Sequence, residues 1–204
     1  ISDDVTIYSA MELQSWAQGA VDAADLYKFR NTEADRIDNC DRSYDEVIAS
    51  IRANSEKSAY ANAFIDAYDP YLLTGYNLNI DSQRPIQSLA LVGEVLATAS
   101  RTWSPEHTEA VVQEIVLSVD DNYKGTRNRI GGSSIRICAL NVMLGGHDGD
   151  GDHINDLNFS SQFLVSMANK LEDINPGDDY SGTEPLDGVS ADPMAGVLDA
   201  MENS

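Results

Sequence analysis

The sequence has few basic residues and no long apolar run. Its 204 residues include 4 Lys and 9 Arg against 23 Asp and 11 Glu, which gives a formal net charge of -21. A chain this negative repels DNA, RNA and anionic membranes, so general nucleic-acid binding is disfavoured. Because no run of about 18 apolar residues is present, we expect no membrane span.

Cysteine is equally scarce. Cys40 and Cys138 lie far apart in the sequence and fit no metal-ligand spacing. Two buried thiols outside any disulfide are the simpler interpretation, and one long-range disulfide is the alternative for an extracellular protein. The sequence also lacks a glycine-rich phosphate loop after a strand, a nucleophile elbow and a His-Glu-x-x-His motif. These absences favour a protein that is not an enzyme.

Acidic residues are in excess. A net charge of about 2 to 8 in magnitude keeps a small domain soluble, so solubility alone does not require -21. At molar salt the Debye length is about 3 Å, and self-repulsion within such a chain is then screened. We interpret the composition as adaptation to high salt, and an ordinary acidic protein or one with an acidic tail is the alternative, although acidic residues are spread from Asp3 to Glu202.

Helical periodicity and capping signals predict a mainly α, bundle-like single domain. A capping box at Ser9 and Glu12 begins the first helix. Its apolar stripe is expected to face the core and consists of Leu13, Trp16, Ala17, Ala20, Ala24 and Tyr27. Start signals at Thr32 and Ser43 predict either one helix over about residues 32–53 with an irregularity near Asp41 or two short helices. Further helices are expected from Ser55 or Ser58 to 68, where Asp69-Pro70 is a stop signal, over 85–97, over 105–119 after a start signal at Ser104-Pro105, and over 133–144 and 163–174.

Three of these segments carry more specific expectations. The helix from Pro105 has the widest apolar face, so we expect it to be the central, most buried element. Residues 133–144 alternate partly like a strand, but Gly145 and Gly146 form a good helix stop and favour a helix. Residues 70–84 form a long apolar loop that packs on its own core or, alternatively, serves as an oligomer contact or lid.

The C-terminal region differs from the rest. We assign residues 1–175 to a helical domain and residues 176–204 to an acidic linker that ends in a short helix. Apolar residues recur in that helix at i, i+3, i+4 and i+7, namely Met194, Val197, Leu198 and Met201. This pattern is typical of a helix that docks into a groove of its own domain or of a partner.

One loop has the spacing of a calcium site. Its carboxylates match positions 1, 3, 5 and 9 of a calcium-binding loop and are Asp148, Asp150, Asp152 and Asp156. His153 stands where that loop requires glycine, and Phe159 stands where a bidentate Glu would complete the shell. A bound divalent cation, first of all Ca²⁺, is therefore one interpretation, and a solvated Asp/Gly turn is the other.

A cluster of basic residues interrupts the acidic chain. Lys124, Arg127, Arg129 and Arg136 lie within 13 residues of one another. They could contact phosphate or an acidic partner surface, and this loop is the one place where local nucleic-acid contact is considered. The alternative is salt bridges within the chain or between subunits.

Together these features predict a non-enzymatic structural or assembly protein. We expect a subunit of a larger homo- or hetero-oligomeric assembly from a salt-adapted source, in the form of a virion connector or neck-like component or a cell-surface component. A virion or extracellular surface is favoured over the cytoplasm. The alternative is a secreted or surface calcium-binding module that uses the loop from Asp148 to Asp156.

Overall fold

The computed structural model describes residues 9–30, 32, 34–76, 84–120, 133–145, 157–174 and 189–202. Its elements are α1 (Ala10–Phe29), α2 (Tyr44–Asn54), α3 (Ser58–Tyr68), the 3-10 helix η1 (Pro70–Leu72), α4 (Arg84–Ser100), α5 (Pro105–Val119), α6 (Ser133–Leu144), α7 (Ser161–Leu171) and α8 (Ala195–Glu202). No strand occurs among these residues, so the mainly α prediction is confirmed, and so is the helix over 133–144.

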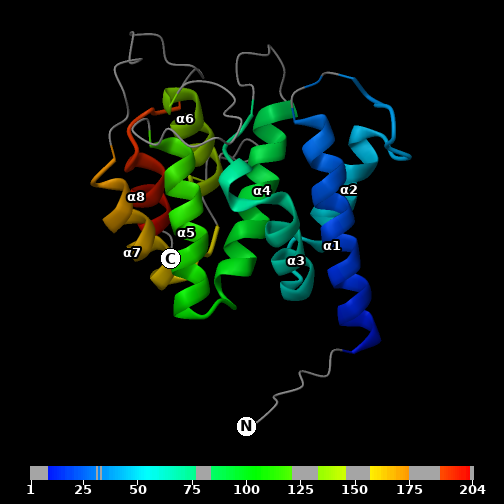
Figure 1. Ribbon diagram of the computed structural model, residues 1–204, viewed down its shortest axis with the longest axis horizontal. Coiled ribbons are helices and arrows are strands. Elements are labelled where there is room, and N and C mark those ends of the chain that lie inside the picture. The colour runs from blue at the N-terminus through cyan, green and yellow to red at the C-terminus, as the bar shows by residue number, and fades with distance from the viewer. Residues whose placement is uncertain are drawn as a thin grey trace.

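The helices stand side by side around one hydrophobic core (Figure 1). α1 packs against α2 and α3 at one end of the molecule, and α3 packs in turn on α4. α4 also contacts α6, while α5 packs on α7 and the C-terminal α8 lies against α6 and α7. The order of packing therefore runs from α1 through the central α4 to α7 and α8.

The helix α4 is more enclosed than α5, so the prediction that α5 is the central, most buried element is wrong. Buried residues occur on every side of α4, whereas α5 has a buried row, including Val112 and Ile115, and a solvent-facing side. α4 is covered by α2, α3 and α6. Gly93 allows the contact with α6, because a Cβ at this position would collide with the backbone carbonyl oxygen of Met143. Gly93 thus marks a close approach of α4 to α6.

The first helix buries a different face from the one predicted. Its buried residues are Gly19, Asp22, Ala23, Leu26 and Phe29. The predicted stripe lies largely in solvent, with Leu13 55%, Trp16 52% and Tyr27 38% exposed. Close approach to α3 explains the choice, because a Cβ at position 19 would collide with the carbonyl oxygen of Tyr60. The bulky side chains of the stripe could not occupy such a contact.

The helix predicted from residue 32 begins only at Tyr44. Ser43 caps it in a capping box with Glu46. In the described residues before α2 the chain makes turns instead of a helix. Asn39 adopts a left-handed φ of 63°, and the Tyr44 N–H donates to the Asp35 carbonyl at 3.0 Å, which closes this segment. The prediction of helix through residues 32–42 is therefore wrong, whereas the start signal at Ser43 is confirmed.

The apolar segment after α3 packs on the protein's own core in its described part. Asp69, with φ 68°, and Pro70 end α3, as the sequence predicts. Tyr71, Leu73 and Tyr76 are buried. This observation confirms the packing prediction for residues 70–76, and residues 77–83 lie outside the described residues.

Candidate interaction surface

The N-terminal helix α1 is fixed at its start and along its buried face. The Glu12 N–H donates to the Ser9 hydroxyl at 3.2 Å, and the Ser9 N–H donates to the Glu12 carboxylate at 2.7 Å. The Ser9 backbone and then its side chain lower the pKa of Glu12, so this carboxylate is ionised when it caps the helix. At 20 residues the helix is about 30 Å long.

A buried carboxylate on α1 ties this helix to its neighbours. Asp22 is fully buried and accepts hydrogen bonds from the Tyr60 hydroxyl at 2.7 Å, the Ser50 hydroxyl at 2.7 Å, the Gln18 amide at 2.8 Å and the Arg42 guanidinium at 2.6 Å. Burial, followed by the hydrogen bond to Asp22, raises the pKa of Tyr60 and keeps this phenol a donor. Because its donors come from α1, α2, α3 and the turn that precedes α2, Asp22 holds these elements together.

Asp25 extends this network towards the surface. The Arg42 guanidinium donates to Asp25 at 2.6 and 3.0 Å, and Lys28 donates to it at 2.8 Å. Burial raises the pKa of Asp25, but the hydrogen bonds from Lys28 and Arg42 outweigh burial and hold this pKa below its ordinary value. The charged groups of α1 thus serve the fold along one side of the helix.

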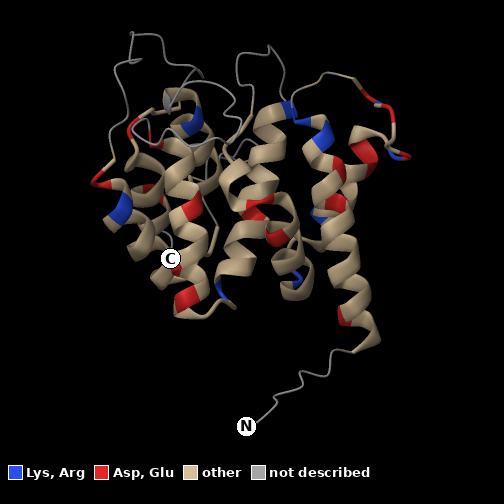
Figure 2. Cartoon of the chain, in the orientation of Figure 1, with Lys and Arg blue, Asp and Glu red and all other residues tan. Residues whose placement is uncertain are grey.

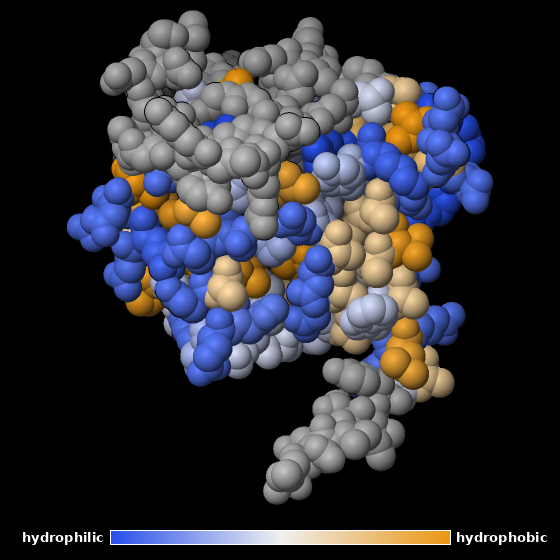
Figure 3. Space-filling model, viewed as in Figure 1, coloured by the Kyte–Doolittle hydropathy of each residue, from blue (hydrophilic) through white to orange (hydrophobic). Residues whose placement is uncertain are grey.

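The opposite side of α1 is apolar and uncharged, and it is exposed except at Ala20, which is half-buried. We call it the α1 face, defined as Leu13, Trp16, Ala17, Ala20, Ala24 and Tyr27. Figure 3 shows tan and orange atoms over part of α1, and Figure 2 shows charged positions on other sides of α1 as well as on the other helices. The Arg30 guanidinium lies 3.6 Å from the centroid of the Tyr27 ring, and Tyr68 meets that ring edge-on at 5.8 Å. The aromatic at this end of the face is therefore held in place.

The sequence identified these residues but assigned them to the core. A second apolar row on the same helix, formed by Ala23, Leu26 and Phe29, was the signal that α1 has more than one apolar face. Gly19, placed beside that row, indicates which face can approach another backbone closely.

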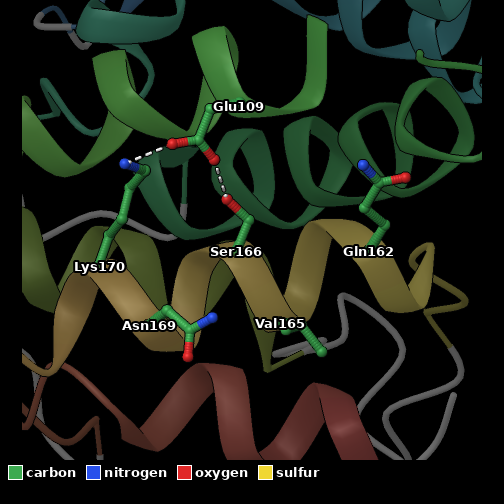
Figure 4. Close-up of a pocket in the computed structure, with 6 residues that line it drawn as sticks. All are labelled: Glu109, Gln162, Val165, Ser166, Asn169 and Lys170. Atoms are coloured by element: carbon green, nitrogen blue, oxygen red, sulfur yellow. Dashed lines mark hydrogen bonds and ion pairs between the residues drawn. The ribbon is translucent and has the colours of Figure 1, made fainter. Parts of the chain in front are cut away.

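A hollow of about 320 Å³ lies between α5 and α7 (Figure 4). It is lined by Glu109, Gln162, Val165, Ser166, Asn169 and Lys170. Lys170 pairs with Glu109 at 2.6 Å, and the Ser166 hydroxyl donates to the other Glu109 oxygen at 2.8 Å. The hydrogen bonds from Lys170 and then Ser166 lower the pKa of Glu109. The charged groups here satisfy one another and link the two helices.

A second hollow, of about 500 Å³, lies beside α4. Its lining residues are Ser55, Glu56, Glu94, Ala97, Thr98, Arg101, Leu157 and Asn158. Arg101 donates to the Asn158 carbonyl at 2.7 Å and to the Thr98 hydroxyl at 3.2 Å, which ties the segment before α7 to α4. The arginine therefore has a structural role in this hollow.

The predicted metal and basic sites lie outside the described residues. This holds for the four loop carboxylates and for three of the basic residues, namely Asp148, Asp150, Asp152, Asp156, Lys124, Arg127 and Arg129. Within the described ranges, no group of three or more His, Cys, Asp or Glu side chains could hold a metal ion. Arg136, the fourth basic residue, is described and lies buried on α6.

The C-terminal helix packs on its own chain. Val197 is fully buried, Met194 and Met201 pack partly against the core, and Leu198 is 53% exposed. The Asn141 side chain accepts from the Gly196 N–H at 3.0 Å and donates to the carbonyl of Ser190 at 2.7 Å. The sequence allows this helix to dock into a groove of its own domain or of a partner. The structure shows it against α6 and α7 of its own domain. The domain boundary predicted at 175 falls between described segments.

The cysteines form no disulfide. Cys138 is buried on α6, and its thiol points to the carbonyl oxygens of Ser190 and Val189 at 3.6 and 3.7 Å, while Cys40 is half-buried. The interpretation as two thiols outside any disulfide is confirmed, although only Cys138 is fully buried. None of the described helices is long and apolar enough to cross a membrane.

Comparison with known proteins gives a family for the whole chain. The family model "Family of unknown function (DUF6571)" matches residues 1–204. The chain belongs to this family. No curated protein and no solved structure matches the chain. Membership in DUF6571 carries no activity with it, so a functional proposal depends on the surfaces described above.

Proposed function

We propose that this protein is a non-enzymatic structural subunit of a larger protein assembly. The observation that carries the proposal is the α1 face, which exposes Leu13, Trp16 and Tyr27 on a chain with a net charge of -21. Contiguous exposed apolar patches on monomeric proteins mark interaction sites, and aromatic residues are enriched in protein interfaces. The helix presenting this face is rigidly fixed by the capping box and the Asp22 network.

The chemistry of the patch favours a protein partner. None of the six side chains of the α1 face carries a charge, so a second acidic surface can approach it without burying a like-charged pair. The net charge supports the finer form of the proposal, an assembly that operates at high salt on a virion or cell surface. At molar salt the repulsion between such subunits is screened, whereas in dilute buffer it opposes assembly.

The test is the mass of the purified protein by size-exclusion chromatography with light scattering. We would compare low salt with molar KCl, each with and without calcium, over a range of protein concentrations. A defined oligomer in molar KCl, independent of calcium, is the expected result. A monomer at every salt and protein concentration would contradict the proposal.

A second candidate function depends on the carboxylate spacing of one loop. Asp148, Asp150, Asp152 and Asp156 match four ligand positions of a calcium loop, which supports a calcium-binding module. A ligand that binds only the folded state raises its stability with the logarithm of ligand concentration. This function predicts that CaCl₂, but not NaCl of equal ionic strength, raises Tm. It also predicts that the variant D148N/D152N loses this response, and an equal response in both proteins would count against it.

A further inference from the structure

We infer that the occupant of the α1 face is a second copy of this chain, whose α1 packs antiparallel to the first around a two-fold axis at Ala20. This inference rests on the proposed function and specifies one contact of the assembly. It follows from the spacing of the face, from the charges beside it and from the length of the helix.

The spacing of the α1 face is symmetric. The residues Leu13, Trp16, Ala20, Ala24 and Tyr27 are separated by 3, 4, 4 and 3 positions. A two-fold axis at Ala20, perpendicular to the helix, therefore places Trp16 opposite Ala24 of the partner subunit. The same axis places Leu13 opposite Tyr27 of the partner subunit. Each large side chain then has a small or complementary neighbour, as self-complementary interfaces require.

The centre of the face permits a close contact. Ala17, Ala20 and Ala24 occupy its middle, while Trp16 and Tyr27 stand on either side of the axis. Small central residues allow two helices to pack at the short end of the usual range of about 8–10 Å. At that distance the exposed halves of the aromatic side chains can cover the partner's alanines.

The charges beside the face favour the antiparallel orientation. Glu12 and Arg30 are eighteen residues apart, which is five turns of about 3.6 residues, so they lie at opposite ends of one edge of the α1 face, the edge next to α3. Antiparallel packing brings Glu12 near Arg30 of the partner subunit at both ends of the contact. Parallel packing would bring like charges together and would also align the helix dipoles unfavourably.

The length of the helix limits the strength of the pair. A single contact between helices about 30 Å long covers less than the roughly 800 Å² per partner of a standard stable interface. We therefore expect a weak, concentration-dependent dimer that becomes tighter as salt screens the repulsion between two acidic chains. A weak contact of this kind is suited to be one of several repeated subunit contacts in an assembly.

The first experiment compares two charge substitutions at sites of equal exposure. Trp16 on α1 is 52% exposed and Leu198 on α8 is 53% exposed. In molar KCl, sedimentation velocity should show that W16D weakens self-association at least tenfold and that L198D leaves it unchanged, with both variants folded by circular dichroism. If W16D associates like the wild type, the inference is overturned while the proposed function stands. A wild-type protein that stays a monomer under every condition would overturn both the inference and the proposed function.

The second experiment tests the axis by disulfide trapping. In a Cys40→Ser background, Ala20→Cys should form a disulfide-linked dimer under mild oxidation, because position 20 meets itself. Ala24→Cys should not, because two copies of position 24 lie about 12 Å apart along the helix, beyond the Cα separation of about 7 Å that a disulfide can span. Trapping at position 24, or at neither position in a protein that still associates, would overturn the antiparallel arrangement. In that case a parallel pair, another contact surface or a different protein partner is indicated.

Discussion

The two faces of α1 are both largely apolar, but only one of them is buried in the core. The buried face has Gly19, a fully buried Asp22 and Leu26, whereas the exposed face has Leu13 and Trp16. Apolar content therefore did not decide which side of this helix entered the core. Backbone fit and a fully satisfied carboxylate decided it, because only a glycine permits the approach to α3 and because Asp22 receives four donors.

This difference explains why an apolar face can remain available for a partner. The buried side of α1 already fixes its position through α2 and α3, so the fold does not depend on Leu13 and Trp16, the most exposed large side chains of the α1 face. Substitutions on the two sides should accordingly have unequal effects, large for stability on the buried side and small on the exposed side.

The largest effect is expected from removing the buried carboxylate. Asp22→Ala leaves the buried Tyr60 hydroxyl and the Ser50 hydroxyl without this acceptor, and it leaves the Arg42 guanidinium with Asp25 as its carboxylate partner. Breaking a buried charged pair of this kind lowers the free energy of unfolding by about 3–5 kcal/mol. Urea denaturation measures it, with Asp66→Ala on the exposed side of α3 as the control, expected within about 0.5 kcal/mol of wild type. Equal losses in both variants would show that the network does not anchor α1.

A smaller effect is expected at the glycine contact. Gly19→Ala should improve helix propensity by about 1 kcal/mol, yet the added methyl collides with the Tyr60 carbonyl oxygen and separates α1 from α3. We expect a net loss of about 2 kcal/mol in the free energy of unfolding, typical of overpacking. Ala24→Gly is the reverse change on the exposed side and should cost only about 1 kcal/mol through propensity. A stabilised Gly19→Ala variant would refute the close-contact argument.

Local signals in the sequence predicted most helices correctly. The capping boxes at Ser9 and Ser43, the Ser104-Pro105 start and the Asp69-Pro70 stop all coincide with helix ends. These signals act through hydrogen bonds and backbone restrictions within a few residues of each other, so they do not depend on tertiary packing.

Features that depend on distant contacts could not be predicted in the same way. The start signal at Thr32 was overridden by turns that bond Tyr44 to Asp35, and α4 became central because three other helices cover it. The stripe of α1 has ordinary core periodicity, and only the approach of Tyr60 to Gly19 shows that it faces solvent. The candidate surface was therefore visible in the sequence as a pattern, but its exposure was not.

A modest effect on stability is expected when the pH falls, because Asp25 lies at the edge of the buried network. Because the pKa of Asp25 is lowered from 3.8, its ionised form stabilises the fold above that pH, and this contribution is lost as the pH falls from about 4 through the lower folded pKa. Asp25→Asn should reduce stability at pH 7 by about 1 kcal/mol, and the difference from wild type should shrink below pH 4. Urea titrations at pH 7 and pH 3 measure it, and a difference that persists undiminished at pH 3 would contradict the assignment.

The smallest effect is expected on the α1 face itself. Leu13→Ala removes a side chain that is 55% exposed and should change the free energy of unfolding by no more than about 0.5 kcal/mol. Leu26→Ala, the same substitution on the buried side of the same helix, should cost about 2–5 kcal/mol because it opens a cavity. Both variants can be compared by urea denaturation at low protein concentration, where self-association does not contribute. A large loss in Leu13→Ala would mean that the α1 face supports the fold, and the case for a free contact surface would fail.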